Sequence, residues 1–236
     1  PAEFMAAVLN SSIRDSKEVV FMIDECKRMK IDVVVPNVNE SEYKFTVNDK
    51  GQISFGMGAV KSVGEVVIQA ITDERNANGK FKDFADFLIR MNGKGVNRKS
   101  IEALAGAGVF DSFDGMHRAM FYHIAEGDKA TFVEKSIKSV SAYLDRKNNA
   151  QFDLFADSEG GEEETFTIPL PECERWSKLK ELEMERELVG FYMSSHPLDM
   201  FRDTIKYFAN IKLENVKNAI EMSRPDTTFR SEEHTS

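Results

Sequence analysis

The 236-residue sequence has little of what marks several large protein classes. Its two cysteines, Cys26 and Cys173, are too few and too far apart for a disulfide framework or a zinc site. No apolar run approaches the roughly 18 residues that a membrane span needs, and the first residues lack the basic and then apolar layout of a signal peptide. These absences, with 30% charged residues, predict a cytoplasmic protein without membrane partners.

Groups that could perform catalysis do not cluster in the sequence either. His117 and His123 lie six residues apart, which fits no common metal-ligand spacing, and His196 before Pro197 fits a helix cap better than a general base. No group of aspartates accompanies a predicted strand, as two-metal phosphoryl transfer requires. We therefore predict no catalytic residue, metal site or cofactor within these residues.

Acidic residues outnumber basic ones, and the net charge of −9 does not favour general nucleic-acid binding. The charge is unevenly distributed, because residues 56–118 carry 9 basic and 8 acidic groups whereas residues 119–236 carry 15 and 23. Six basic side chains lie close together in the middle of the sequence: Lys80, Lys82, Arg90, Lys94, Arg98 and Lys99. A nucleic-acid contact is therefore expected there.

Hydrophobic periodicity predicts an α+β fold that is predominantly α-helical. Asp15, followed three residues later by Glu18, predicts a capping-box helix start, and the apolar residues after it share one helical face. A short strand over residues 31–35, ended by Pro36, and a hairpin that turns at residues 48–51 are expected to form the small β element.

From residue 56 the pattern changes to short helices joined by glycine turns. Four large apolar residues at helical spacing are expected in the core rather than in a base-stacking site: Phe81, Phe84, Phe87 and Leu88. Later helices are expected over residues 116–126, 129–146, 174–193 and 198–208. The polar residues 148–167 are expected to form a mobile linker.

Two turns, Ser62-Val63-Gly64 and Gly106-Ala107-Gly108, follow the small–apolar–glycine pattern that links two helices. Glycine permits a close backbone approach, and the free N–H groups at the next helix start can bind a phosphate without reading base sequence. One such turn more often only ends a helix, but two turns with basic residues between them favour DNA binding. Ser62 replaces the usual glycine, so the first turn is the weaker candidate. The expected DNA-binding residues are Gly58, Lys61, Ser62, Val63, Gly64, Lys94, Asn97, Arg98, Lys99, Gly106 and Gly108.

The sequence NAQFDLFA, residues 149–156, sets a Leu-Phe pair in a polar stretch that has no core of its own. Such a pair is either incidental or inserts into a pocket of a partner. Burial of the two side chains contributes roughly 1.5–3 kcal/mol each, which gives weak binding that tethering strengthens. We therefore predict a docking peptide: Gln151, Phe152, Asp153, Leu154 and Phe155.

Several blocks of the sequence resemble, in order, the C-family of bacterial replicative DNA polymerases, the catalytic alpha subunits of DNA polymerase III. The blocks are PAEFMAAVLNS, DECKRMKIDVVVPNVNES, FGMGAVKSVGE, NRKSIEALAGAGVFDSF and ELVGFYMSSHPLD, and QFDLF resembles that family's internal sliding-clamp-binding motif. The resemblance covers residues 1–210. The sequence departs from the family at Ser62 and at residues 34–37, where the family commonly has a proline pair and an aspartate.

The resemblance implies a full-length DNA-directed DNA polymerase that extends a primer by nucleotidyl transfer. Two Mg²⁺ ions would be held by palm-domain aspartates that precede Pro1, so this chain is expected to be an inactive fragment that needs no cofactor of its own. Its implied role is to bind duplex DNA and to attach the enzyme to the sliding clamp (beta subunit), beside other replisome subunits. Gln151, Asp153, Leu154 and Phe155 would bind the clamp, with the last two as apolar anchors.

The resemblance also implies a division of the chain. Residues 1–55 would be distal fingers with the small β-hairpin, 56–147 the tandem helix-hairpin-helix and following helices, 148–168 the acidic linker with the clamp motif, and 169–223 a helical lead-in to an oligonucleotide-binding domain. Residues 224–236 would be a truncated tail. Its last seven residues, RSEEHTS, match a translated sequencing adapter and are expected to be an artefact.

Two other classes of function stay open. A non-catalytic helix-hairpin-helix scaffold of DNA repair would explain the glycine turns but not the clamp-like peptide. A helical interaction protein that contacts no nucleic acid would leave both the paired turns and the basic residues unexplained.

Overall fold

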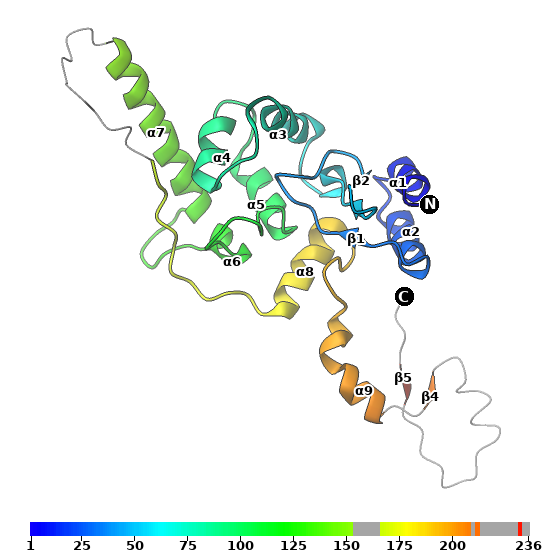
Figure 1. Ribbon diagram of the computed structural model, residues 1–236. Helices are drawn as coiled ribbons and strands as arrows, with labels where there is room; N and C mark the ends of the chain where they lie inside the picture. The colour runs from blue at the N-terminus through cyan, green and yellow to red at the C-terminus, as the bar shows by residue number, and fades with distance from the viewer. Residues whose placement is uncertain (153–165, 209–210, 213–230, 233–236) are drawn as a thin grey trace, which may run out of the picture. The chain divides into compact units, whose positions relative to one another are not determined.

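The computed structural model describes residues 1–152, 166–208, 211–212 and 231–232, and its contacts divide the chain into two units, residues 1–193 and 194–236 (Figure 1). The helices of the first unit are α1 (Ala2–Ser11), α2 (Ser16–Arg28), η1 (Met57–Ala59), α3 (Glu65–Asn78), α4 (Phe84–Met91), α5 (Arg98–Gly106), α6 (Arg118–Tyr122), α7 (Phe132–Phe152) and α8 (Lys178–Val189). Its strands are β1 (Val33–Val34), β2 (Thr46–Val47) and β3 (Ile53–Ser54). The predicted α+β, predominantly α-helical fold is confirmed.

The three strands form a small sheet in the order β1-β3-β2. Strands β2 and β3 pair antiparallel as the predicted hairpin, and Gly51 in the turn has a φ of 74° that favours glycine. The Asn48 carboxamide oxygen closes the turn by accepting hydrogen bonds from the amides of Lys50 (3.0 Å) and Gln52 (2.9 Å). Strand β1 pairs parallel to β3 and is shorter than the predicted strand over residues 31–35.

Helix α2 begins where the sequence predicts. The Asp15 carboxylate accepts hydrogen bonds from the amides of Lys17 (3.0 Å) and Glu18 (3.3 Å), which leave two fewer unpaired donors at the helix start. The carboxylate of Glu18 pairs with the hydroxyl of Ser12 instead of the cap amide, so the predicted capping box forms only in part. The buried side chains of α2 lie on the predicted face: Val19, Ile23 and Cys26.

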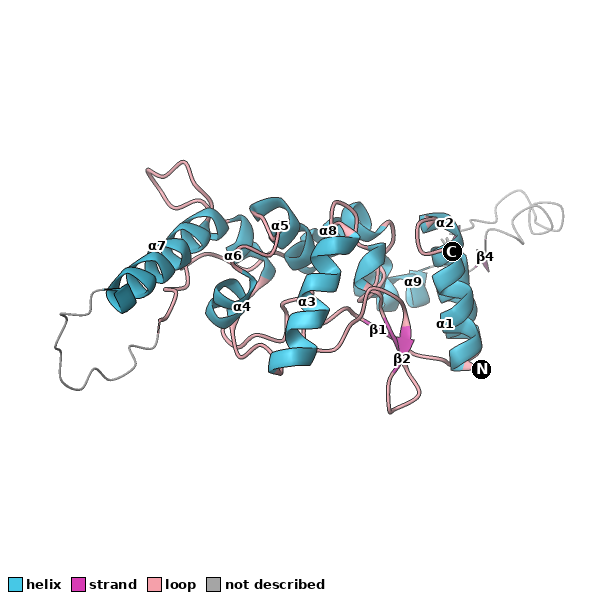
Figure 2. Cartoon of the chain, turned by 90° about the horizontal axis from the view of Figure 1, so that it is seen from above, coloured by secondary structure: helices cyan, strands magenta, loops and turns pink. Residues whose placement is uncertain are grey.

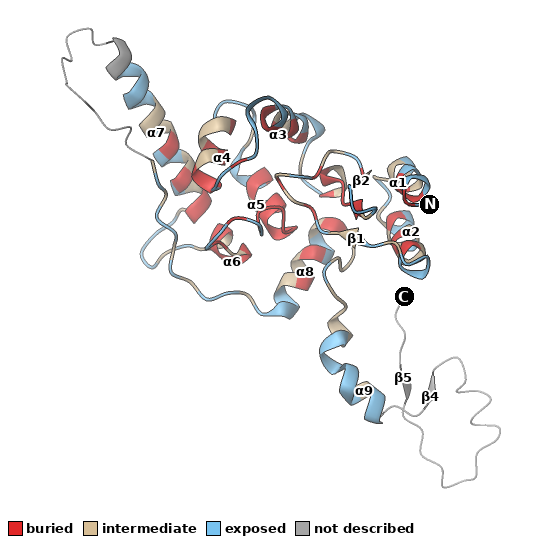
Figure 3. Cartoon of the chain, viewed as in Figure 1, coloured by how far each residue is buried: buried red, intermediate tan, exposed pale blue. Residues whose placement is uncertain are grey.

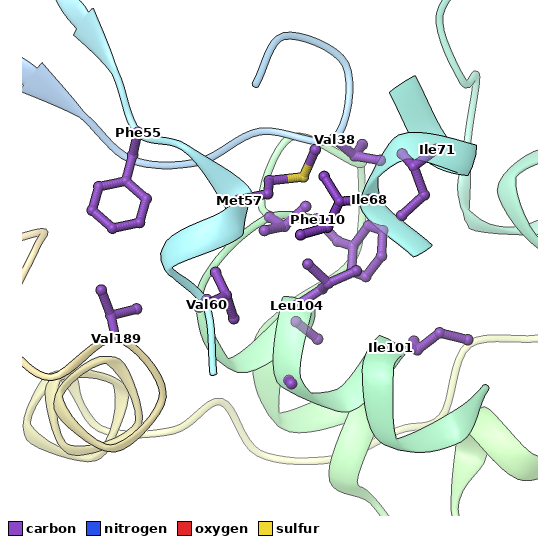
Figure 4. Packing of buried hydrophobic residues seen from close by; sticks show 14 of the residues in the cluster. Val38, Phe55, Met57, Val60, Ile68, Ile71, Ile101, Leu104, Phe110 and Val189 are labelled. Carbon is purple, nitrogen blue, oxygen red and sulfur yellow. The ribbon is translucent and has the colours of Figure 1, made fainter. Parts of the chain in front are cut away.

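One hydrophobic core runs through the first unit, and the buried residues of Figure 3 mark it in most of its helices. The predicted core residues Phe81, Phe84, Phe87 and Leu88 are all buried. Phe84 meets Phe121 edge-to-face at 5.0 Å between ring centroids, an arrangement that aromatic pairs favour. In Figure 4, Val189 of α8 lies beside Phe55 and Val60. Because this core crosses residues 55 and 147, the predicted domain boundaries there fall inside one packed unit and stay predictions about function alone.

The later helices differ from prediction mainly at their ends. Helix α6 is shorter than the predicted helix over residues 116–126, and α7 continues to Phe152. The prediction of a linker from residue 148 is therefore wrong for residues 148–152, because no glycine or proline interrupts the helical run before Gly160. Residues 153–165 lie outside the described residues. After them the chain returns to α7, where Phe166 stacks on Tyr143 at 4.6 Å between centroids.

The second unit contains η2 (Pro197–Phe201), α9 (Arg202–Phe208) and the parallel pair β4 (Ile211–Lys212) and β5 (Ser231–Glu232). As predicted, His196 caps a helix, with its ring Nδ1 accepting a hydrogen bond from the Leu198 amide (3.2 Å). Among the described residues, no helix is both long enough and apolar enough to cross a membrane.

Candidate nucleic-acid interface

The first predicted turn joins η1 to α3, and in the view from above α3 lies between α4 and β1 (Figure 2). Ser62 has a φ of 68°, in the left-handed region that favours glycine, so the serine adopts the backbone conformation expected of the residue it replaces. Gly64 is the N-cap of α3 and has an extended conformation. No atom lies within 4 Å of the position where a Cβ of Gly64 would stand. The turn therefore has the predicted geometry and open space at its glycine.

Most amides of this turn have no hydrogen-bond partner in the described part of the chain. The amides of residues 62, 64, 65 and 66 donate to no acceptor in the described part of the chain, whereas Val63 closes a hydrogen-bonded turn over residues 60–63. The first bonded amides of α3 belong to Val67 (3.1 Å) and Ile68 (3.3 Å), both to the Gly64 carbonyl. Ser62, Gly64 and Glu65 are exposed. Free N–H groups and the positive end of the helix dipole meet at this point, which is the arrangement that binds anions.

The side chains around the turn have mixed charge. A pocket of about 260 Å³ beside it is lined by residues that include Arg14, Ser16, Lys61 and Ser62. The Arg14 guanidinium lies 3.7 Å from the carboxylate of Glu65, the first residue of α3. An acidic residue suits the start of a helix but repels a phosphate, so Glu65 opposes the anion site that the amides form.

Gly58 and Lys61, both predicted to bind DNA, make contacts within the protein. The Gly58 amide donates to the Tyr43 carbonyl (2.9 Å), and a Cβ at Gly58 would lie 2.7 Å from the Tyr43 ring. The Lys61 amide donates to the Leu188 carbonyl (2.8 Å), and its ammonium donates to the Glu187 carbonyl (3.1 Å). Packing therefore accounts for the glycine, and the lysine fastens the turn to α8.

The second predicted turn has a different geometry. The Gly108 amide donates to the Ala105 carbonyl (2.9 Å) and the Val109 amide to the Leu104 carbonyl (3.0 Å), with Gly108 at a φ of 87°. This is the Schellman pattern that ends a helix with glycine in the left-handed conformation. The Ala107 amide is bonded as well, and the next helix begins only at Arg118. The expectation that outward amides follow this turn is therefore wrong.

Both glycines of the second turn are needed for packing. A Cβ at Gly106 would lie 2.4 Å from Leu188 Cδ1 and 2.6 Å from the Tyr122 hydroxyl. A Cβ at Gly108 would lie 2.5 Å from a terminal nitrogen of Arg118. The sequence favours the second turn as the DNA-binding candidate, because Ser62 replaces a glycine in the first. The structure favours the first turn, because the second is buried.

Most of the predicted basic patch is neutralised by acidic groups. Arg98 pairs with Glu102 (2.7 Å) and Glu134 (2.9 Å), and Lys94 pairs with the buried carboxylate of Glu74. Hydrogen bonds from Lys94, Arg90 and Asn78 lower the pKa of Glu74 to about 2. DNA binding by Lys94 and Arg98 stays a prediction, and the charges of both residues have acidic partners outside the sequence window that suggested the patch.

Asn97 and Lys99 differ from their neighbours. Asn97 caps α5, with its side-chain oxygen accepting from the Ser100 amide and the Ser100 hydroxyl accepting from the Asn97 amide, both at 3.0 Å. Lys99 is exposed and forms no ion pair with any described residue. Among the described residues of the basic patch, Lys99 and Lys82 are both exposed without an ion pair, and Lys99 is the one of these two that was predicted to bind DNA.

The predicted docking peptide lies at the limit of what the structure describes. Gln151 and Phe152 belong to the last turn of α7, and Asp153, Leu154 and Phe155 lie outside the described residues. Within the described ranges, no three histidine, cysteine or acidic side chains gather as a metal site. The docking peptide stays a prediction.

Sequence reasoning missed two charged residues that support the turns. Arg118 and Glu185 pair at 2.9 Å, and their side chains are only 5% and 0% exposed. A basic residue directly before the apolar stretch Ala119-Met120-Phe121 is a signal, though a weak one, that Arg118 has a buried partner. Nothing local identifies Glu185 as that partner, because it lies 67 residues later.

Comparison with known proteins gives a consistent result. A family profile described as helix-hairpin-helix motif matches residues 30–120. DNA polymerase III subunit alpha of Vibrio cholerae is 36% identical over 216 residues, covering 90% of this chain and 18% of that protein. The corresponding subunits of Escherichia coli K12 and Pseudomonas aeruginosa are 34% and 33% identical, covering 92% and 93% of this chain. The chain spans less than a fifth of the length of these relatives, 18% and 19% of the last two.

Proposed function

The chain is homologous to one segment of the bacterial DNA polymerase III alpha subunit, and we propose that it belongs to a replicative enzyme that extends DNA by nucleotidyl transfer. In that enzyme, the segment binds duplex DNA through the sugar–phosphate backbone. The observation that supports this role most directly is the set of amides without a hydrogen-bond partner at residues 62, 64, 65 and 66, which are all exposed residues at the start of α3. The helix-hairpin-helix match includes this turn.

Backbone amides bind phosphate oxygens and do not distinguish bases. The contact therefore serves an enzyme that must hold any template sequence with equal strength. The open space at Gly64 permits a phosphate to approach the backbone closely, and the exposed Lys99 can neutralise a further phosphate. The second turn supports the fold instead of contacting the nucleic acid, so the proposed footprint of this segment is small.

A salt titration of duplex binding tests the proposal. The full chain is titrated with a fluorescently labelled duplex, and anisotropy is measured between 20 and 200 mM salt, a range of roughly one decade. With one to three phosphates contacted, the logarithm of the association constant is expected to fall against log salt with a slope of about −1 to −3. Two unrelated sequences of equal length are expected to bind alike. Absence of salt-dependent binding at the lowest salt contradicts the proposal.

We also propose that residues 151–155 attach the enzyme to the sliding clamp. Leu154 and Phe155 supply the apolar anchors, and the Gln151 side chain supplies a hydrogen bond at the rim of the cleft. Replacing both anchors by alanine is expected to abolish binding to an immobilised bacterial sliding clamp. Replacing Asp157 and Ser158 by alanine is the matched control, because it changes two polar residues of the same stretch. Equal clamp binding by the two double variants overturns the assignment.

Catalysis, its Mg²⁺ and the other replisome subunits are properties that we propose for the whole enzyme. This segment is expected to show no primer extension with Mg²⁺ and nucleotides, because it carries none of the implied palm aspartates. A repair scaffold is the less favoured alternative, since similarity to the polymerase subunit covers about nine tenths of the chain. Primer extension by the segment alone contradicts the proposed division of labour.

A further inference from the structure

Helix α8 lies far from both turns in sequence and contacts each of them. Its residue Glu185 is fully buried and accepts a hydrogen bond from Arg118 (2.9 Å). Arg118 also holds Asp111 (2.7 Å) and lies against the backbone of Gly108. Burial works to lower the pKa of Arg118, but the hydrogen bonds and charges of Asp111 and Glu185 outweigh it and raise the pKa. The second turn is thus held from α8 by a charged network.

The first turn is held by the C-terminal end of the same helix, two and three residues after Glu185. The Lys61 amide donates to the Leu188 carbonyl at 2.8 Å, and the Lys61 ammonium donates to the Glu187 carbonyl at 3.1 Å. The last carbonyls of a helix lack partners within it and favour a cation nearby. Gly190 then ends α8 in the left-handed conformation, with a φ of 102°. Residue 61, immediately before the exposed turn, therefore caps the end of α8.

Close packing fixes the C-terminal part of α8, where both contacts lie. Val189 is 3% exposed and lies beside Phe55 and Val60, as Figure 4 shows. Leu188 occupies the space that a side chain at Gly106 would need, since a Cβ there would lie 2.4 Å from Leu188 Cδ1. The helix cannot shift along α5 without a clash or a cavity, so its position determines where the first turn begins.

We propose that α8 is a positioning helix for duplex binding, with Lys61 and Glu185 as its positioning residues. The proposal rests on the proposed function, because it concerns how the turn over residues 62–64 is held before DNA arrives. A turn with several unbonded amides has few internal hydrogen bonds to order it, and ordering it on binding weakens affinity. Fastening residue 61 to α8 removes part of that cost. Glu185 holds the helix in place from a site that DNA cannot reach.

Three single variants of the full chain test the inference: Glu185→Gln, Lys61→Met and Val140→Ala. Glu185→Gln keeps the size of the side chain and removes its charge, whereas Lys61→Met keeps the backbone bond to Leu188 and removes the ammonium. Val140→Ala is the control, because Val140 is a buried residue of α7 whose truncation lowers stability without contact with either turn. Duplex affinity, its salt slope and exchange of the Lys61 amide are measured well below the thermal midpoints.

Glu185→Gln and Lys61→Met are expected to weaken duplex binding roughly 3- to 10-fold with an unchanged salt slope, and to accelerate exchange of the Lys61 amide. Val140→Ala is expected to bind like the wild type. A slope reduced by about 1 in Lys61→Met makes Lys61 a phosphate ligand and overturns its positioning role. If the wild type binds duplex and Glu185→Gln matches it in affinity and amide exchange, the inference fails alone. If the wild type binds no duplex, the proposed function fails and the inference with it.

Discussion

Replacing Gly64 by alanine separates binding from folding at the first turn. Gly64 has a φ of −76°, which alanine adopts without strain, and no atom lies within 4 Å of the added Cβ. Lower entropy of the unfolded chain is expected to stabilise the variant by about 0.4–1 kcal/mol. Alanine is a poorer N-cap than glycine by about the same amount. The two effects nearly cancel, so the free energy of unfolding is expected to stay within about 1 kcal/mol of the wild type.

Duplex binding is expected to respond strongly to the same change. The Cβ occupies the space through which a phosphate would approach the amides of residues 64–66, and a hydrogen bond to a charged group contributes about 1.5–3 kcal/mol. Loss of one such bond weakens binding by about 10- to 150-fold. Anisotropy titration and denaturant unfolding measure the two quantities on the same sample.

A neighbouring change in the same turn serves as the control. Ser62→Gly relieves a left-handed residue and is expected to stabilise the fold by about 1 kcal/mol while duplex affinity is kept or slightly increased. Wild-type duplex affinity in a well-folded Gly64→Ala variant would refute the reasoning, because it would show that no phosphate comes close to this glycine.

Three further predictions concern single charges. Lys99→Glu is expected to lower the salt slope of duplex binding by about 1. Lys50→Glu is the control, because Lys50 is an exposed lysine in the β2–β3 turn, and it is expected to leave the slope unchanged. Equal slopes for the two variants exclude Lys99 from the contact. Glu65→Gln removes the carboxylate at the start of α3 and is expected to tighten duplex binding about two- to fivefold at low salt, so unchanged affinity in anisotropy titration argues against a phosphate at that helix start. The pKa of Glu74 is lowered to about 2 from 4.5, so its stabilisation is present above pH 4.5 and is lost as the pH falls toward 2. In the Glu74→Gln variant, the free energy of unfolding is expected to fall less between pH 4.5 and pH 2 than in the wild type. Parallel pH profiles of the unfolding free energy for the variant and the wild type would contradict this.

Local patterns predicted the local structure well. Asp15 caps α2, the β2–β3 hairpin turns where its asparagine and glycine require, and the four core residues from Phe81 to Leu88 are buried. Each of these features depends on residues that are close in sequence, where periodicity and turn chemistry decide the outcome. The positions of helix ends were predicted less accurately. Helix α7 continues beyond its predicted end at residue 146, because no glycine or proline interrupts it there.

The candidate interface was predicted only in part. The features that distinguish one turn or one cation from another depend on residues far away in the sequence. The two glycine turns are alike in sequence, but Leu188 covers Gly106 from 82 residues away whereas Gly64 stays open. Arg98 looks like a free cation until Glu134 is found beside it, 36 residues later. Spacing within a window shows which residues share a face, and it does not show which charges meet across the fold.

Helix α8 comes long after the two glycine turns in the sequence, but it is needed to hold them in place. A gene shortened after codon 147 would keep both glycine turns but lose Leu188 and Val189, which cover part of the hydrophobic core. Because core residues would then be exposed to water, the product is expected to be insoluble. Expression clones meant to isolate the turns must therefore extend to residue 193, however peripheral the intervening stretch looks on a linear map.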